Sequence, residues 1–165
     1  MSQYISISLI SNNMQQKDAQ NIAEKIISCD EITSIKQFYY PYYQYNINCK
    51  LPFLFGGNRI SINALIDACS GEGITTDVLE ITRSYALKQE MLDIKNHETQ
   101  ANKKLKSFIT NHLNQKFKAF FNYEKVLENK GIIYKLFWMI EYSKESVLID
   151  SVTKNFEILN TKKRA

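Results

Sequence analysis

The sequence predicts an α+β protein in which antiparallel sheets, formed by two related helix-plus-hairpin units, pack with a long amphipathic helix. Three observations predict it: several runs of alternating apolar and polar residues, one early segment at helical spacing, and one later segment at heptad-like spacing. The chain has 165 residues, of which 44% are hydrophobic and 23% are charged, which suits one compact body with its own core.

We expect a first unit at residues 1–82, which contains a strand, a helix and an aromatic hairpin. Residues 4–10 alternate between apolar and polar side chains, which indicates a half-buried strand. The next apolar residues recur at helical spacing and predict an amphipathic helix: Ala19, Ile22, Ala23, Ile26 and Ile27. Residues 34–50 and 59–67 alternate again, so they can pair as an antiparallel hairpin, and residues 74–81 can add a short strand.

We expect residues 83–165 to contain the long helix and a second antiparallel meander. Between residues 83 and 121 the following residues are spaced by alternating steps of four and three: Leu87, Met91, Ile94, Glu98, Ala101, Leu105, Phe108 and His112. This spacing predicts one long helix or two helices that meet near residues 96–102, and such a helix could also pair two copies of the chain as a homodimer. Residues 132–142 are the most hydrophobic segment and favour a central strand, and residues 147–152 and 156–159 complete the meander.

The two halves carry similar segments, which predicts an internal duplication. Residues 64–71 and 147–154 both contain Leu-Ile-Asp followed by a hydroxyl residue three positions after the Asp. A carboxylate at such a position accepts hydrogen bonds from backbone N–H groups two or three residues later. We therefore expect Asp67 and Asp150 to be structural turn residues and not catalytic acids.

A helix followed by a hairpin with an Asp-x-x-Thr-Gly-like turn resembles the PepSY-type domain of bacteria. The resemblance rests on residues 148–153 and, more loosely, on residues 65–71, and it covers roughly two thirds of the chain in two copies. In the second copy Lys154 stands where that family has Gly. The resemblance implies a small α+β fold without catalytic chemistry and a regulatory or inhibitory role.

Residue patterns typical of enzymes, cofactor sites and metal sites do not occur in the sequence. His97 and His112 have no Cys near them, and the spacing of Cys29, Cys49 and Cys69 fits neither a zinc motif nor a closed set of disulfides. Neither a glycine-rich phosphate loop nor a Gly-x-Ser-x-Gly elbow is present. We therefore expect a protein that is not an enzyme and that needs neither a cofactor nor a metal ion.

The apolar residues are too dispersed for a membrane-spanning segment. No run approaches 18 consecutive apolar residues, and the first ten residues have neither a basic stretch nor a small-residue cleavage site. We expect a cytoplasmic protein.

Charge is distributed unevenly along the chain. Residues 1–80 contain five basic and eight acidic residues, whereas residues 81–165 contain sixteen basic and nine acidic ones. A Lys-rich helical face at residues 95–135 could neutralise phosphates. The other interpretations are a solvated face and a surface that attracts an acidic protein. The alternative function is thus a nucleic-acid-binding accessory protein that uses five lysines: Lys103, Lys104, Lys106, Lys116 and Lys118.

Aromatic residues point to a different contact surface. Residues 39–45 place tyrosines on both faces of a strand, and an apolar tip at residues 53–55 follows. Either this is an exposed contact patch or the strand is buried between helices on both sides. The predicted function is a non-enzymatic regulatory or inhibitory (immunity-type) module that binds a protein or peptide through five residues: Tyr40, Tyr42, Phe53, Phe55 and Arg59.

Overall fold

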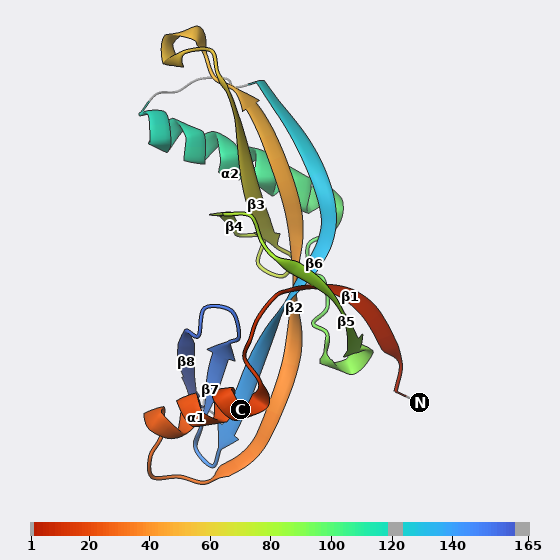
Figure 1. The fold of residues 1–165 in the computed structure, drawn as a ribbon, viewed down its shortest axis with the longest axis vertical. Helices are drawn as coiled ribbons and strands as arrows, with labels where there is room; N and C mark the ends of the chain where they lie inside the picture. The colour runs from red at the N-terminus through yellow and green to blue at the C-terminus, as the bar shows by residue number, and fades with distance from the viewer. Residues whose placement is uncertain (1, 119–123, 161–165) are drawn as a thin grey trace. The chain divides into compact units, whose positions relative to one another are not determined.

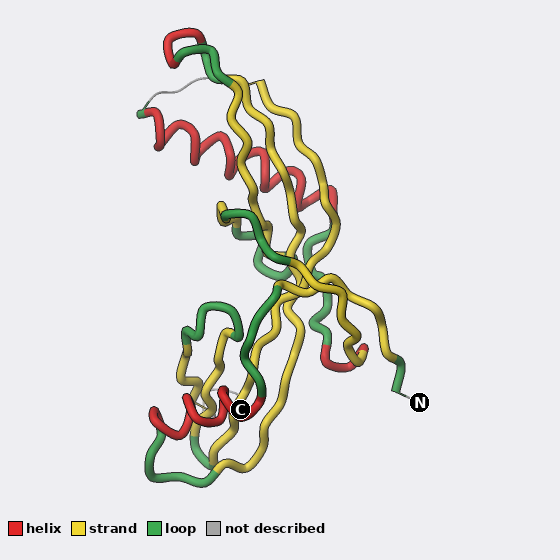
Figure 2. Tube along the Cα trace, viewed as in Figure 1, coloured by secondary structure: helices red, strands yellow, loops and turns green. Residues whose placement is uncertain are grey.

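The structure is a computed structural model that describes residues 2–118 and 124–160 (Figure 1). Of these residues 50% are in strands and 24% are in helices, and the strands belong to one mixed sheet (Figure 2). The elements in chain order are β1 (Tyr4–Ile10), α1 (Gln16–Ile26), β2 (Ile32–Lys50), β3 (Arg59–Asp67), β4 (Gly73–Thr76), β5 (Ile81–Leu87), α2 (Glu98–Phe117), β6 (Glu124–Tyr142), β7 (Glu145–Asp150) and β8 (Phe156–Asn160). Single 3₁₀ turns lie at Phe53–Phe55 and Lys88–Glu90.

The predicted fold class, with antiparallel sheets packed with a long amphipathic helix, is wrong. The strands form one sheet in the order β4-β3-β2-β6-β1-β5, and β7 and β8 extend it from β6. This sheet is mixed, because β1 pairs with β6 in parallel at Leu9 and Tyr134 while most of its other pairs are antiparallel. The helices are short, and they comprise 11 residues in α1 and 20 in α2.

The long helix is absent because its first part forms a strand. Residues Ile81–Leu87 pair along their whole length with β1 in an antiparallel register, from Tyr4 opposite Leu87 to Ile10 opposite Ile81. This pairing satisfies the backbone hydrogen bonds of the segment through a partner distant in sequence. The helix begins only at Glu98, and its buried residues recur every four positions: Ala101, Leu105, Ile109 and Leu113.

The chain divides into two compact units that each combine segments from both halves. Unit 1 comprises the residues up to Tyr40, Glu80–Leu92 and the residues from Tyr134 onward. Unit 2 comprises Pro41–Leu79 and Asp93–Ile133. The long strands β2 and β6 therefore contribute one part to each unit.

In unit 1 the helix α1 packs against alternate residues of the sheet. Its buried residues Ala19 and Ala23 belong to one apolar cluster with side chains of β6 and β7, such as Ile140 and Val147. Burial alternates along β6, since Trp138 and Ile140 are buried while their neighbours Phe137, Met139 and Glu141 are half-buried. This period of two is expected for a strand whose two faces differ in environment.

In unit 2 the helix α2 covers the corresponding face of β2 and β3. Leu105 and Ile109 belong to one buried cluster with Tyr45, Ile47 and Ile66. The alternation predicted for residues 43–49 is confirmed, because the odd-numbered side chains of this segment are buried and those between them are half-buried or exposed. The Tyr45 hydroxyl donates a hydrogen bond to Asn102 Oδ1 at 2.6 Å.

Both halves of the chain contain the same order of elements: strand, helix, long strand and two further strands. In each copy a matching turn connects the last two strands. The Asp side chain accepts hydrogen bonds from backbone N–H groups two and three residues later, at 2.7 and 2.8 Å after Asp67 and at 2.9 and 3.1 Å after Asp150. The fourth residue after each Asp has a positive φ, 79° at Gly71 and 62° at Lys154. The second copy begins with β5 at Ile81, so its first strand crosses the expected boundary between residues 82 and 83. The origin of the copies by duplication stays a prediction.

Candidate functional site

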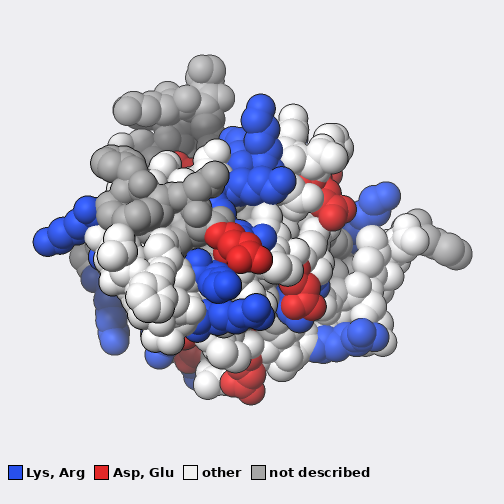
Figure 3. Space-filling model, turned by 90° about the horizontal axis from the view of Figure 1, so that it is seen from above, with Lys and Arg blue, Asp and Glu red and all other residues white. Residues whose placement is uncertain are grey.

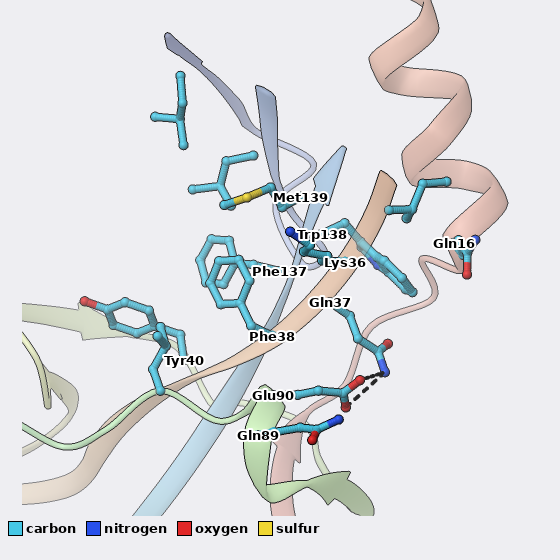
Figure 4. A pocket seen from close by; sticks show the side chains of 14 residues that line it. Gln16, Lys36, Gln37, Phe38, Tyr40, Gln89, Glu90, Phe137, Trp138 and Met139 are labelled. Atoms are coloured by element: carbon cyan, nitrogen blue, oxygen red, sulfur yellow. Dashed lines mark hydrogen bonds between the residues drawn. The ribbon is translucent and has the colours of Figure 1, made fainter. Parts of the chain in front are cut away.

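Unit 1 contains a groove of about 890 Å³ that is open to solvent (Figure 4). Its walls come from β2, β6, β7, β8, the first residue of α1, the 3₁₀ turn at Lys88–Glu90 and Leu92, all within this unit. The apolar and aromatic side chains used below are Phe38, Tyr40, Phe137, Met139, Leu148 and Leu159. Most lie on the sheet face opposite the α1 cluster, because they alternate with that cluster's buried residues along the same strands.

The aromatic rings of this groove contact one another. The rings of Phe38 and Phe137 are stacked, with centroids 5.6 Å apart and planes inclined by 10°. Tyr40 meets Phe137 edge to face at 5.9 Å. These rings are only half-buried, so they form an apolar surface that remains accessible to a ligand.

One side of the groove is polar. Gln37 donates hydrogen bonds through Nε2 to both carboxylate oxygens of Glu90, at 3.2 and 3.3 Å. Figure 4 shows these two side chains near Gln89 on one side of β2, with the rings of Phe38 and Phe137 on the other. The groove therefore combines an apolar wall with a side that carries a carboxylate and amides.

A second charged group borders the aromatic wall. Lys36 forms an ion pair with Glu141, with Nζ 2.9 Å from Oε2, and Ser34 Oγ donates a hydrogen bond to the same carboxylate. The Lys36 side chain is 62% exposed. Because an exposed ion pair contributes little to stability, this lysine can turn towards a ligand at small cost.

A more buried ion pair, between Lys135 and Asp150, lies next to Phe137. Their side chains are 18% and 13% exposed, and Lys135 Nζ is 5.5 Å from the centroid of the Phe137 ring. Burial raises the pKa of Asp150, but hydrogen bonds from Lys135 and from the turn N–H groups outweigh it and hold this pKa below its ordinary value. Asp150 is therefore an ionised anchor at neutral pH.

The matching sheet face of unit 2 is polar. Strand register identifies the equivalent positions, since Tyr42 lies opposite Asp67 as Phe137 lies opposite Asp150. Two residues further along, Gln44 of unit 2 matches Met139 of unit 1. The open face is thus less polar in unit 1, although both helix-covered faces are apolar.

Hydrogen bonds confirm the polar character of the unit 2 face. Asn46 donates through Nδ2 to Asn63 Oδ1 at 2.9 Å and to Ser61 Oγ at 3.0 Å. Asn48 donates to Asn46 Oδ1 at 3.2 Å. A face already occupied by such a network offers little apolar area to a partner.

The five predicted contact residues are not brought together in one unit. Tyr40 lines the groove of unit 1, whereas Tyr42, Phe53, Phe55 and Arg59 belong to unit 2. Phe53 is 92% exposed at a 3₁₀ turn, while the half-buried Phe55 meets the Phe117 ring at 5.3 Å. Arg59 is exposed at the first position of β3.

The five predicted lysines lie on or directly after α2. Lys103, Lys104, Lys106 and Lys116 are exposed residues of the helix, and Lys118 follows its last residue with a φ of 50°. Lys104 donates a hydrogen bond to the Ser70 carbonyl at 3.3 Å. On the face seen in Figure 3, acidic side chains lie among the basic ones, so the visible Lys and Arg residues form no uninterrupted patch.

Sequence reasoning missed the groove residues Phe137, Met139 and Glu90. Residues 132–142 are apolar at almost every position, so their composition does not distinguish the open face from the covered one. Glu90 lies in the segment predicted to be helical, where a charged side chain is unremarkable. Their roles follow from the pairing of β2 with β6 and from the Gln37–Glu90 hydrogen bonds.

No family model, no curated protein and no solved structure matches this chain. None of the helices in the described part of the chain is both long and apolar enough to cross a membrane. Within residues 2–118 and 124–160, no three His, Cys, Asp or Glu side chains are grouped so that they could hold a metal ion. Cys29 is exposed, Cys69 is half-buried and Cys49 is buried, and all three are free thiols.

Proposed function

We propose that this protein is a non-enzymatic module that binds a protein or peptide partner in the groove of unit 1. The single observation that supports this most is the half-buried aromatic wall formed by Phe38, Tyr40 and Phe137 on a sheet face that no described helix covers. Exposed aromatic clusters next to polar groups are typical of protein-binding surfaces. A regulatory or inhibitory role, as the PepSY-type resemblance implies, and a cytoplasmic location belong to this proposal.

The side chains that line the groove fit the binding of a macromolecular ligand better than they fit catalysis. The charged side chains among them are one lysine and one carboxylate, and the carboxylate is hydrogen-bonded to Gln37. The other polar groups of the groove are amides, the Tyr40 hydroxyl and the Trp138 indole. A nucleophile activated by a neighbouring base is not among the residues that line it. Such a surface offers apolar area and orientation, which are the contributions that a binding site needs.

The test compares partner capture by three forms of the full chain. The double variant Phe38→Ala/Phe137→Ala removes the stacked rings, and Phe53→Ala is the matched control because it removes a phenyl ring that is 92% exposed in unit 2. Each form is used to capture proteins from an extract of the native host, and the captured partner is then purified and titrated. Circular dichroism checks that each variant is folded.

We expect the double variant to bind the purified partner at least about tenfold more weakly and Phe53→Ala to bind it normally. Unchanged binding by the double variant contradicts the proposal. Loss of binding in Phe53→Ala places the contact surface on unit 2 instead. Salt-dependent binding of labelled DNA or RNA, lost in a Lys103→Ala/Lys106→Ala variant, supports the nucleic-acid alternative against this one.

A further inference from the structure

We infer that the groove binds an extended peptide that adds a strand to the outer edge of β2 at Thr33–Gln37, with apolar side chains towards Phe38 and Phe137 and a basic side chain towards Glu90. This inference rests on the proposed function, and it specifies how the partner is held. The partner is thus a protein that presents an extended segment with alternating apolar and basic residues.

The first part of β2 is an edge strand. Within unit 1, β6 lies between β7 and β2, β8 pairs with β7, and the β1–β5 pair joins β6 only at Tyr134. β3 pairs with β2 only from Tyr42 to Lys50, and an isolated bridge joins Tyr39 to Met91. Among the strand pairs of the described residues, none occupies the outer side of Ile32–Phe38. This side of the strand is therefore available for backbone pairing.

The direction of the backbone groups on this edge follows from the hydrogen bonds of Tyr39 and Pro41. The Tyr39 carbonyl accepts a hydrogen bond from Leu92 N–H at 3.0 Å, and the Pro41 carbonyl accepts one from Ala68 N–H at 3.1 Å. Both donors lie on the side of β2 away from β6. Because the direction alternates along a strand, the N–H and C=O groups of Thr33, Ile35 and Gln37 also point away from β6.

The groove lies along this edge and differs on its two sides. Phe38 and Phe137 line it on one side of β2, and Gln37 and Glu90 line it on the other (Figure 4). Successive side chains of an added strand would point alternately to these two sides. The apolar wall then receives every second residue of the peptide, and the Glu90 carboxylate favours a lysine or arginine among the others.

The equivalent edge of unit 2 is blocked by features that unit 1 lacks. Tyr134 of β6 is equivalent to Tyr39 of β2, and the residues before them match in the same register. Glu128, Lys130 and Gly131 therefore match Thr33, Ile35 and Lys36, respectively. Gly131 has a φ of 98°, and its N–H is bonded to the Asn129 side chain at 2.8 Å.

Charges and irregular backbone are the means by which proteins prevent unwanted pairing at sheet edges. Residues 33–37 of β2 contain one charge, Lys36, whereas the matching residues 128–132 contain two, Glu128 and Lys130. The charges of both edges are paired, Lys36 with Glu141 and Lys130 with Glu128, so the clearest difference is the positive φ at Gly131. The chain therefore protects one of two equivalent edges and leaves the other accessible, which is expected if the second edge binds a strand.

The probe is a blocked heptapeptide, acetyl-Thr-Phe-Lys-Phe-Lys-Phe-Thr-amide. Seven residues span roughly 23 Å, enough to pair with Thr33–Gln37, and the design places all Phe side chains on one side and all Lys side chains on the other. Two matched peptides carry N-methyl groups either on the three Phe amides or on the two Lys amides. In a paired strand only one of these two sets of N–H groups faces β2, so the two peptides have the same side chains and differ in their hydrogen bonds.

Binding to the full chain is measured by calorimetry and by the fluorescence of Trp138, the only tryptophan of the chain, which lies in the groove wall. We expect the parent peptide to bind, one N-methylated peptide to bind at least about tenfold more weakly, and the other to bind like the parent. We expect Glu90→Gln to weaken binding severalfold and to reduce its salt dependence. The matched change Gln89→Ala, which retains the carboxylate, should have little effect.

Three results would overturn the inference that a partner peptide adds a strand here. Equal binding by both N-methylated peptides shows that the groove holds side chains without backbone pairing, and it leaves the proposed function in place. Failure of all three peptides to bind at millimolar concentration refutes the inferred peptide chemistry, while capture of a partner through Phe38 and Phe137 still decides the proposed function. Concentration-dependent dimerisation in sedimentation, abolished by Ile35→Lys but not by Ile158→Lys on the exposed face of β8, shows that a second copy occupies the edge.

Discussion

Replacing Asp150 with Asn isolates the contribution of its ion pair with Lys135. Asp150 Oδ1 accepts the turn hydrogen bonds from Val152 and Thr153, whereas Oδ2 pairs with Lys135. The amide oxygen of Asn can still accept the turn hydrogen bonds, so the variant removes the negative charge and leaves the turn in place.

The magnitude follows from the burial of the pair. Exposed ion pairs contribute up to about 1 kcal/mol, while breaking a fully buried pair costs about 3–5 kcal/mol. With side chains 18% and 13% exposed, the pair of Lys135 and Asp150 lies between these limits, and we expect a loss of roughly 2 kcal/mol. For a chain of this size that lowers the midpoint of thermal unfolding by roughly 4–8 °C.

The loss should depend on pH. Because the pKa of Asp150 in the folded state lies below its ordinary value, the stabilisation is present above the pKa of the unfolded chain and is lost as the pH falls through the lower pKa. The difference in free energy of unfolding between the wild type and Asp150→Asn is therefore full at neutral pH and closes below about pH 4.

The assay is thermal and urea unfolding of both proteins between pH 3 and pH 7. Lys135→Met serves as the second arm of a double-mutant cycle, and we expect the double variant to lose less stability than the sum of the single variants. A variant as stable as the wild type at pH 7, or a difference that does not change with pH, would refute this account of the ion pair.

Three further predictions concern unit 2. Burial first, and then the charges of Glu98 and Tyr43, raise the pKa of Tyr45 to about 12, so its contribution to stability is lost as the pH rises from about 10 to about 12. In an absorbance titration, Tyr45→Phe should lack the tyrosine ionisation step near pH 12. A wild type without this step contradicts the prediction. Replacing the fully buried Ile109 with Ala should cost about 2–5 kcal/mol in urea unfolding, and a loss below 1 kcal/mol would show that α2 is loosely packed. Gly73→Ala should cost about 1–3 kcal/mol, since its methyl group would lie 2.5 Å from an atom of the Phe108 ring, and a neutral variant would show that the ring yields freely.

Much of the strand pattern could be predicted from the sequence because alternation depends on nearby residues. The strands at residues 4–10 and 59–67 have the predicted bounds, and residues 43–49 alternate as predicted. Along residues 43–49 the buried side chains belong to one cluster with α2, so burial selects apolar residues at every second position. Local spacing alone then identifies both the element and its covered face.

The sequence could not exclude the predicted long helix, because its first part becomes a strand only by pairing with a distant segment of the chain. Leu87, Met91 and Ile94 have helical spacing, yet the residues up to Leu87 form β5 through seven pairs with β1. Residues of β1 and β5 are more than 70 positions apart, so no window of local sequence contains both. A long-range pairing of this kind overrides local propensity.

The groove could not be assembled from the sequence for the same reason. Phe38 and Phe137 are distant in the chain, and their stacking depends on the register of β2 against β6. Of the predicted contact residues, Tyr40 alone lines this groove. Tyrosines on both faces of β2 did indicate an unusual strand, but the length over which each face is covered depends on where α1 and α2 pack.

Hydrogen–deuterium exchange of the full chain, with and without its purified partner, tests the central claim most directly. The account predicts that the partner slows exchange of the outward N–H groups of Ile35 and Gln37, which no described strand protects in the free protein. It predicts little change at residues 53–59 and along α2 (Glu98–Phe117). Protection confined to either of those segments, with unchanged exchange at residues 33–38, would contradict the account.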